Sequence, residues 1–219
     1  MNQTIATLTV GLLTAGFASA AVFDLASDFS VENGNPNGVW TYGQLDTLSS
    51  PFTPWVISGI SEAPYAPSSF WHSSDPGDTN PSAWQNLTSQ THFGIQPNEV
   101  ALHPGSSGQG AAVRWTAPAG DAGVAYSVNV TFGAGSIGSM SLAVLFNGST
   151  VWTGSDSGSF SETRVLSSGD HYDFVVHSGY FFGNTPVSAY LTTVPEPSAY
   201  AAIAAAGLGA LAVWRRRRS

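Results

Sequence analysis

The first half of the sequence holds a group of aromatic residues that could bind sugars. Exposed aromatic rings stack on the apolar faces of sugar rings, and polar neighbours bind the hydroxyls. We therefore predict glycan contact by Trp55, Trp71, His72 and Trp84. The alternative, which applies to most of the rings, is that they fill the core of a domain with few aliphatic residues. The full group is Trp40, Tyr42, Trp55, Tyr65, Phe70, Trp71 and Trp84.

One short loop carries oxygen ligands of the kind that calcium prefers. Asp75, Asp78 and Asn80 surround a Pro-Gly pair, and calcium binds six to eight oxygens from such loops. The loop lacks the glutamate and the spacing of an EF-hand, so a solvated Asx-type turn is the alternative. Apart from this candidate calcium ion, we expect no cofactor.

Motifs of common enzyme classes are missing or stand in the wrong context, so we expect no catalytic residue. Residues 133–138 match G-x-G-x-x-G, but an alternating strand follows where a dinucleotide fold needs a helix. Residues 154–158 resemble a nucleophile elbow with Asp156 in place of the serine. The alternative is a secreted polysaccharide-active enzyme, either a glycoside hydrolase or a lyase, because paired carboxylates from different strands leave no sequence signature.

The five histidines do not form a helical zinc motif. His171 and His177 lie on one face of a single predicted strand but about 20 Å apart, too far to share a metal ion. His171 and Asp173 are neighbours on that face, and we interpret them as a structural pair.

Charge excludes nucleic acid as a partner. The chain has 219 residues, a net charge of −8, no cysteine and no lysine. Between residues 21 and 193, Arg114 and Arg164 stand against 13 acidic residues, which cannot neutralise a phosphate backbone. Without cysteine, no disulfide or thiolate zinc site is available.

Alternating hydrophobicity predicts an all-β body over residues 21–193. In 123–132, Val124, Tyr126, Val128, Val130 and Phe132 share one face of a half-buried strand. Asn147-Gly148 predicts a hairpin after strand 140–146. The regular spacing favours an antiparallel β-sandwich of jelly-roll type. Other predicted strands are 39–42, 55–57, 91–95, 99–103, 111–117, 151–153, 161–166, 171–177 and 187–193, and residues 51–86 are predicted to form ordered loops around short strands.

The N-terminus has the features of a secretory signal peptide over residues 1–20. An uncharged apolar stretch is followed by Ala18 and Ala20 at the small −3 and −1 positions of a cleavage site. We therefore expect cleavage before Ala21, with the secretion machinery as a partner.

The C-terminal segment, residues 194–219, combines three features. Pro195, Glu196 and Pro197 form an extended break after the last strand. Residues 199–214 are uncharged and form the predicted transmembrane helix, about 24 Å long. Next come Arg215, Arg216, Arg217 and Arg218, a stop-transfer cluster expected to stay cytoplasmic.

This combination resembles the PEP-CTERM sorting signal of Gram-negative bacteria, a tail also labelled an ice-binding-protein C-terminal domain. The resemblance implies recognition and processing by exosortase, a membrane protease. It also implies residence at the inner membrane during sorting and then in the cell envelope, at the surface or in the extracellular matrix. The alternative is a plain membrane anchor.

Residues 29–43, 100–105 and 113–118 resemble parts of a β-sandwich module of exported bacterial proteins, whose sheets look like those of jelly-roll carbohydrate-binding modules. The resemblance implies a fold but no activity. We therefore expect a non-enzymatic, surface- or matrix-sorted protein whose body is structural or contacts extracellular polysaccharide.

Overall fold

A computed structural model describes residues 20–61, 68–73, 80–135, 139–178, 184–194, 207–209, 213–214 and 216. Residues Ala21–Val194 form one compact unit, and residues 1–20 and 195–219 are grouped as another. Of the predicted leader and tail, Ala18, Pro195, Glu196, Pro197, Arg215, Arg217 and Arg218 lie outside the described residues.

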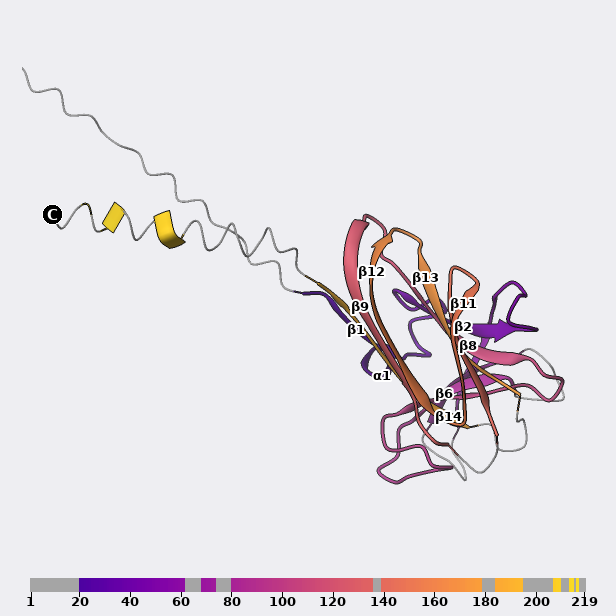
Figure 1. Ribbon diagram of the computed structural model, residues 1–219. Helices are drawn as coiled ribbons and strands as arrows, with labels where there is room; N and C mark the ends of the chain where they lie inside the picture. Colours follow the sequence, from indigo (N-terminus) through magenta and orange to yellow (C-terminus); the bar gives the residue numbers. More distant parts are fainter. Residues whose placement is uncertain are drawn as a thin grey trace, which may run out of the picture. The chain divides into compact units, whose positions relative to one another are not determined.

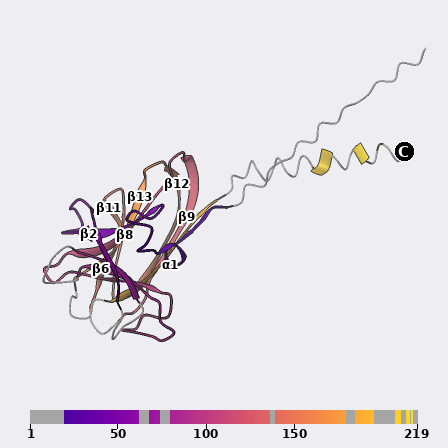
Figure 2. The same ribbon diagram turned by 180° about the vertical axis from the view of Figure 1, so that it is seen from behind.

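Two antiparallel sheets stack face to face in the Ala21–Val194 unit (Figure 1). Among the described residues, sheet A has the order β12-β9-β14-β7-β6-β5-β4, with β1 also paired to β14, and sheet B has the order β11-β10-β13-β8-β2-β3. Figure 2 shows the same two layers from behind. From β7 to β10 and from β11 to β14 each connection crosses between the sheets, which is typical of jelly rolls. The antiparallel β-sandwich prediction is confirmed.

The sheet A strands are β1 (Val22–Asp24), β4 (Ile57–Ser61), β5 (Ser68–His72), β6 (Ser82–Asn86), β7 (Val100–His103), β9 (Ala122–Phe132), β12 (Gly158–Ser167) and β14 (Thr185–Thr193). The sheet B strands are β2 (Trp40–Leu45), β3 (Thr53–Pro54), β8 (Gly110–Thr116), β10 (Ser141–Phe146), β11 (Ser149–Ser155) and β13 (His171–His177). One helical turn, α1 (Leu25–Asp28), follows β1, and the Asp24 carboxylate caps it by accepting from the Ala26 backbone N–H.

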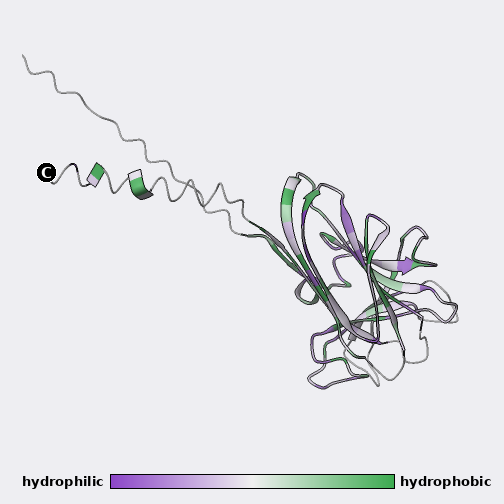
Figure 3. Cartoon of the chain, viewed as in Figure 1, coloured by the Kyte–Doolittle hydropathy of each residue, from purple (hydrophilic) through white to green (hydrophobic). Residues whose placement is uncertain are grey.

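The core lies between the sheets and follows the period-2 pattern. Tyr126, Val128, Val130 and Phe132 of β9 are buried as predicted. Trp115 is also buried and makes edge contacts with Phe23 and Tyr126. Figure 3 shows the strands in mixed green, white and purple, as expected when inward and outward residues alternate.

Two of the predicted strands are wrong in detail. Residues 91–95 make only an isolated bridge between His92 and Ile95, because Phe93 and Gly94 adopt positive φ in a tight turn. Trp55 precedes β4 instead of belonging to it. The Asn147-Gly148 turn between β10 and β11 has positive φ at both residues, as the predicted hairpin requires.

In the predicted membrane helix, residues 207–209, 213 and 214 are helical, and the remainder lies outside the described residues. Within the described part of the chain, no helix is long and apolar enough to cross a membrane.

Candidate functional site

The outward side chains of β12, β9 and β14 form a regular arrangement on sheet A. Strand register aligns three cross-strand rows, each with one residue from every strand. Neighbouring strands are about 4.8 Å apart, and successive outward residues of one strand about 6.6 Å. We call this set the polar grid; its rows are Ser159–Thr131–Ser188, Ser161–Asn129–Tyr190 and Thr163–Ser127–Thr192.

The polar grid carries no charged side chain, and most of its members are exposed. Hydrogen bonds connect several of them within and between strands. Asn129 donates to Ser127 Oγ at 3.0 Å and accepts from Ser161 Oγ at 2.7 Å. The Thr131 and Ser159 hydroxyls lie 3.1 Å apart. These bonds orient polar groups on a face that remains open to solvent.

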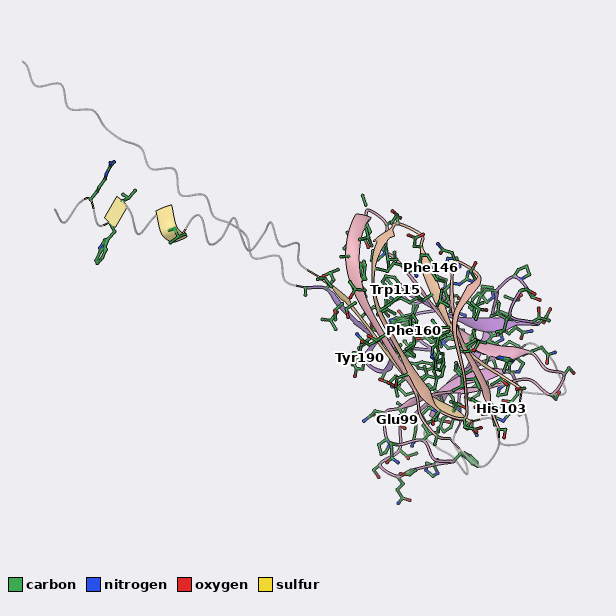
Figure 4. All side chains as sticks on the ribbon, viewed as in Figure 1. Glu99, His103, Trp115, Phe146, Phe160 and Tyr190 are labelled. Atoms are coloured by element: carbon green, nitrogen blue, oxygen red, sulfur yellow. The ribbon has the colours of Figure 1, made fainter. Side chains whose placement is uncertain are left out.

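Tyr190 is the aromatic member of the polar grid, and 44% of its surface is exposed. A recess of about 300 Å³ lies beside its ring, and we call it the Tyr190 recess. Thr131 and Ser188 of the grid also line the recess, and its far wall is formed by Ala26 and the turn 97–100. Figure 4 shows Tyr190 and Glu99 on the same side of the domain, whereas Trp115 lies between the layers.

A buried glutamine fixes the far wall of the Tyr190 recess. Gln85 Nε2 donates to the Ala26 carbonyl at 2.7 Å and to the Asn98 carbonyl at 3.1 Å. Glu99 is held by its own turn, because its Oε2 accepts from the Gln96 N–H at 2.7 Å. The aromatic ring, the carboxylate and the grid hydroxyls therefore surround a preformed hollow.

A second groove, of about 570 Å³, lies near α1. Asp28, Ser30, Asn33 and Asn37 are among the polar residues that line it. Trp40, also in its lining, is only 1% exposed and donates its Nε1–H to the Asp28 carboxylate at 3.0 Å. The Trp40 ring is part of the core, Phe29 in the same lining is 8% exposed, and Phe23 is partly buried against the core.

The structure corrects the glycan-contact prediction for two of its four residues. Trp55 and Trp71 are each 4% exposed, so neither has a free ring face. Each also uses its indole N–H internally: Trp55 donates to Gln44 Oε1 at 3.0 Å, and Trp71 to the Ser30 carbonyl at 2.9 Å. Both rings belong to the core cluster, and Trp71 stacks on Tyr42 of β2, which local sequence does not reveal.

Trp84 and His72 are half-buried and occupy neighbouring strands of sheet A. Trp84 donates to Asn184 Oδ1 at 2.8 Å. His72 Nδ1 lies 2.6 Å from the Ser73 carbonyl, and its ring contacts Phe70. Contact between these two residues and a glycan stays a prediction.

Of the predicted calcium ligands, Asp75 and Asp78 lie outside the described residues, and Asn80 Oδ1 accepts from Ser82 Oγ at 2.9 Å. In the described part of the chain, no three acidic or histidine side chains are grouped as a metal site. A calcium ion in this loop is therefore still a prediction.

Two ion pairs engage the arginines of the body. Arg114 and Asp173 form a bidentate pair at 2.6 and 2.9 Å, and Arg114 also lies 4.3 Å from the Phe52 ring centroid. Asp173 thus pairs with Arg114 instead of His171, whose Nδ1 lies 3.3 Å from the Gly169 carbonyl.

The second pair joins Arg164 to Glu162 at 2.9 Å, and Tyr172 also donates to Glu162. Burial alone would raise the pKa of Glu162, but the bonds from Arg164 and Tyr172 outweigh it and lower the pKa. Burial of the Tyr172 hydroxyl and its bond to Glu162 raise the pKa of Tyr172. Each carboxylate therefore neutralises one arginine on the strands of the sandwich.

Tyr190 and Glu99 are site residues that the sequence did not predict. Tyr190 stands in an alternating strand, where Val187, Ala189 and Leu191 face inward, and this pattern does indicate an outward ring. No sequence signal indicates that the 96–99 turn lies against β14.

Comparison with known proteins identifies the tail. The family of the PEP-CTERM protein-sorting motif matches residues 193–218. The chain ends in a PEP-CTERM sorting motif. The match includes Pro195, Glu196, Pro197 and all four tail arginines, so the predicted sorting signal is confirmed. A protein with this motif is an exported protein handled by the membrane sorting system.

The chain has low similarity to three solved carbohydrate-binding modules. A family 35 module from Clostridium thermocellum is 12% identical, covers 82% of this chain and 100% of its own, and has a TM-score of 0.33. A family 35 module from Paenibacillus barcinonensis is 15% identical, covers 44% of this chain and 78% of its own, and has a TM-score of 0.28. A family 36 module in complex with calcium and xylotriose is 12% identical, covers 63% of this chain and 92% of its own, and has a TM-score of 0.27. No curated protein matches the sequence.

Proposed function

We propose that this exported PEP-CTERM protein is a non-enzymatic carbohydrate-contacting module sorted to the cell surface or extracellular matrix. The observation that carries the proposal is the uncharged polar grid around the exposed Tyr190 ring. An extended saccharide offers apolar ring faces and many neutral hydroxyls, which match one aromatic ring among hydroxyl and amide groups.

The geometry of the polar grid suits a chain of sugar units better than a single small molecule. Three strands present partners at repeats of about 4.8 and 6.6 Å, so hydroxyls along a chain meet several rows. The Tyr190 recess then receives one unit, while the open grid contacts its neighbours. Trp84 and His72 are proposed as a second contact on the same sheet.

Sorting is proposed to proceed from both ends of the chain. The signal peptide 1–20 is removed before Ala21, and helix 199–214 holds the protein in the inner membrane with Arg215–Arg218 in the cytoplasm. Exosortase then recognises Pro195-Glu196-Pro197. Replacing these three residues by alanine is expected to retain the protein in the membrane fraction, and unchanged fractionation contradicts this route.

A glycan array with the purified full chain tests the carbohydrate proposal. We expect binding to a polysaccharide without release of reducing ends. Tyr190→Ala is expected to weaken that binding about tenfold, because the stacking surface is lost. Tyr190→Phe, which keeps the ring, serves as the matched control and should retain most of the affinity. Release of reducing ends would instead support the polysaccharide-active enzyme.

A further inference from the structure

The charge of Glu99 is not balanced by any arginine of the body. The body contains only Arg114 and Arg164 as permanent cations, and these pair with Asp173 and Glu162. Glu99 Oε2 accepts one backbone N–H, and among the described residues its carboxylate makes no ion pair. The Tyr190 recess therefore has a net negative charge beside its aromatic ring.

The chemistry of this recess selects among sugars. A uronic acid would place a second carboxylate against Glu99 and meet a strongly acidic body, which repels anions. A neutral sugar leaves the Glu99 carboxylate without a charged partner. A sugar with a free ammonium group supplies that partner, and a charge-assisted hydrogen bond to a carboxylate is stronger than a neutral one.

We propose that the Tyr190 recess binds a hexosamine unit with a free amino group, as found in partly deacetylated amino-sugar polysaccharides. Its ammonium group pairs with the Glu99 carboxylate, and its ring packs on Tyr190. The hydroxyls of Thr131 and Ser188, which line the same recess, bind the ring hydroxyls. This inference rests on the proposed carbohydrate function and specifies the class of sugar.

Two glucosamine hexamers that differ only in acetylation provide the test. Isothermal titration of the full chain is expected to show about tenfold tighter binding of the fully deacetylated hexamer than of the fully N-acetylated one. Glu99→Gln should reduce this preference to about equal binding, with unfolding unchanged. Thr131→Lys places a cation at the recess without altering Glu99, and it should also abolish the preference.

Asp46→Asn is the matched control, because it removes one negative charge from an exposed position next to β2 in the other sheet. The preference should survive this change. If Asp46→Asn lowers it as much as Glu99→Gln, diffuse attraction explains the preference and the proposed site is wrong. Equal binding of both hexamers by the unaltered protein also overturns it.

The two proposals fail in different ways. Tyr190-dependent binding to neutral glycans, without preference for the free amine, refutes the amino-sugar site and leaves the carbohydrate function standing. Absence of binding to the hexamers and to every array glycan refutes both.

Discussion

The outer faces of the two sheets are built by the same alternation of residues but serve different ends. On sheet B, part of the outward face is an apolar cluster of strand residues, and Leu48 and Phe52 pack against it. On sheet A, the polar grid of β9, β12 and β14 is uncharged, and most of its residues are exposed. The covered set is Leu45, Ala112, Ala143, Leu145 and Val175.

The difference shows what the side chains of each face do. Outward apolar residues on sheet B lie under the segment after β2, and the Arg114–Asp173 pair lies beside Phe52. These groups bury surface and stabilise the fold. The grid residues contribute little burial, so their donors and acceptors remain available to a ligand. Substitutions should therefore change stability on one face and binding on the other.

The largest loss of stability is expected on the covered face from Arg114→Met. Asp173 is 1% exposed, and removing its partner leaves a buried charge uncompensated. We expect the free energy of unfolding to fall by about 3 kcal/mol, measured by urea denaturation. Adding Asp173→Asn should restore much of the loss, and failure to do so would contradict the role of the pair.

A smaller loss is expected from Phe52→Ala, which uncovers the apolar cluster on sheet B. The ring is only partly buried, so we expect a decrease of about 2 kcal/mol, below the full cost of a core phenylalanine. Thermal unfolding measures the change. Saccharide binding by the folded variant should be unaffected; a parallel loss of affinity would mean that the covered face also contacts the ligand.

The covered face should also respond to pH through His177. Burial lowers its pKa below 6.5, so protonation favours the unfolded state. With His177 neutral, its contribution to stability is fully present above pH 6.5. That contribution decreases as the pH falls below 6.5. His177→Gln should remove this part of the pH dependence in urea titrations. An identical slope in both proteins would contradict it.

Glu162 and Asp170 are expected to reduce stability at a lower pH than His177 does. Bonds from Arg164 and Tyr172 outweigh burial and lower the pKa of Glu162, and the bond from the Ser167 N–H lowers that of Asp170. Their stabilisation is present above their ordinary values of 4.5 and 3.8 and disappears on further acidification.

The smallest effect on stability is expected on the open face. Tyr190→Ala should change the free energy of unfolding by no more than about 0.5 kcal/mol, because the side chain is 44% exposed on the outer face of sheet A. Urea denaturation measures this, with Phe52→Ala as the contrasting variant. A loss as large as that of Phe52→Ala would show that Tyr190 is a packing residue.

Local patterns predicted the strands but not their neighbours. Alternation in 123–132 correctly separated Tyr126 and Val128 from Ser127 and Asn129, since each strand fixes its own two faces. That β9 lies between β12 and β14 depends on long-range pairing, which no local pattern encodes. The polar grid was therefore not predictable as a unit.

For the aromatic residues, the exposure expected from the sequence was wrong. Trp55 and Trp71 lie in irregular sequence, which suggested exposed rings, yet both are buried. Both rings pack in the core cluster, and the hydrogen-bond partner of Trp71, Ser30, is 41 residues away in the sequence. Tyr190 lies in a regular strand and is exposed, so local regularity was a poor guide to ring accessibility.

Nuclear magnetic resonance titration of the full chain with its array-selected saccharide tests the central claim most directly. We expect amide shifts to concentrate on residues 127–131, 159–163 and 188–192, the polar-grid segments of sheet A. Shifts concentrated on the outward residues of β8 and β13, or near the groove at Asp28 and Trp40, would contradict it.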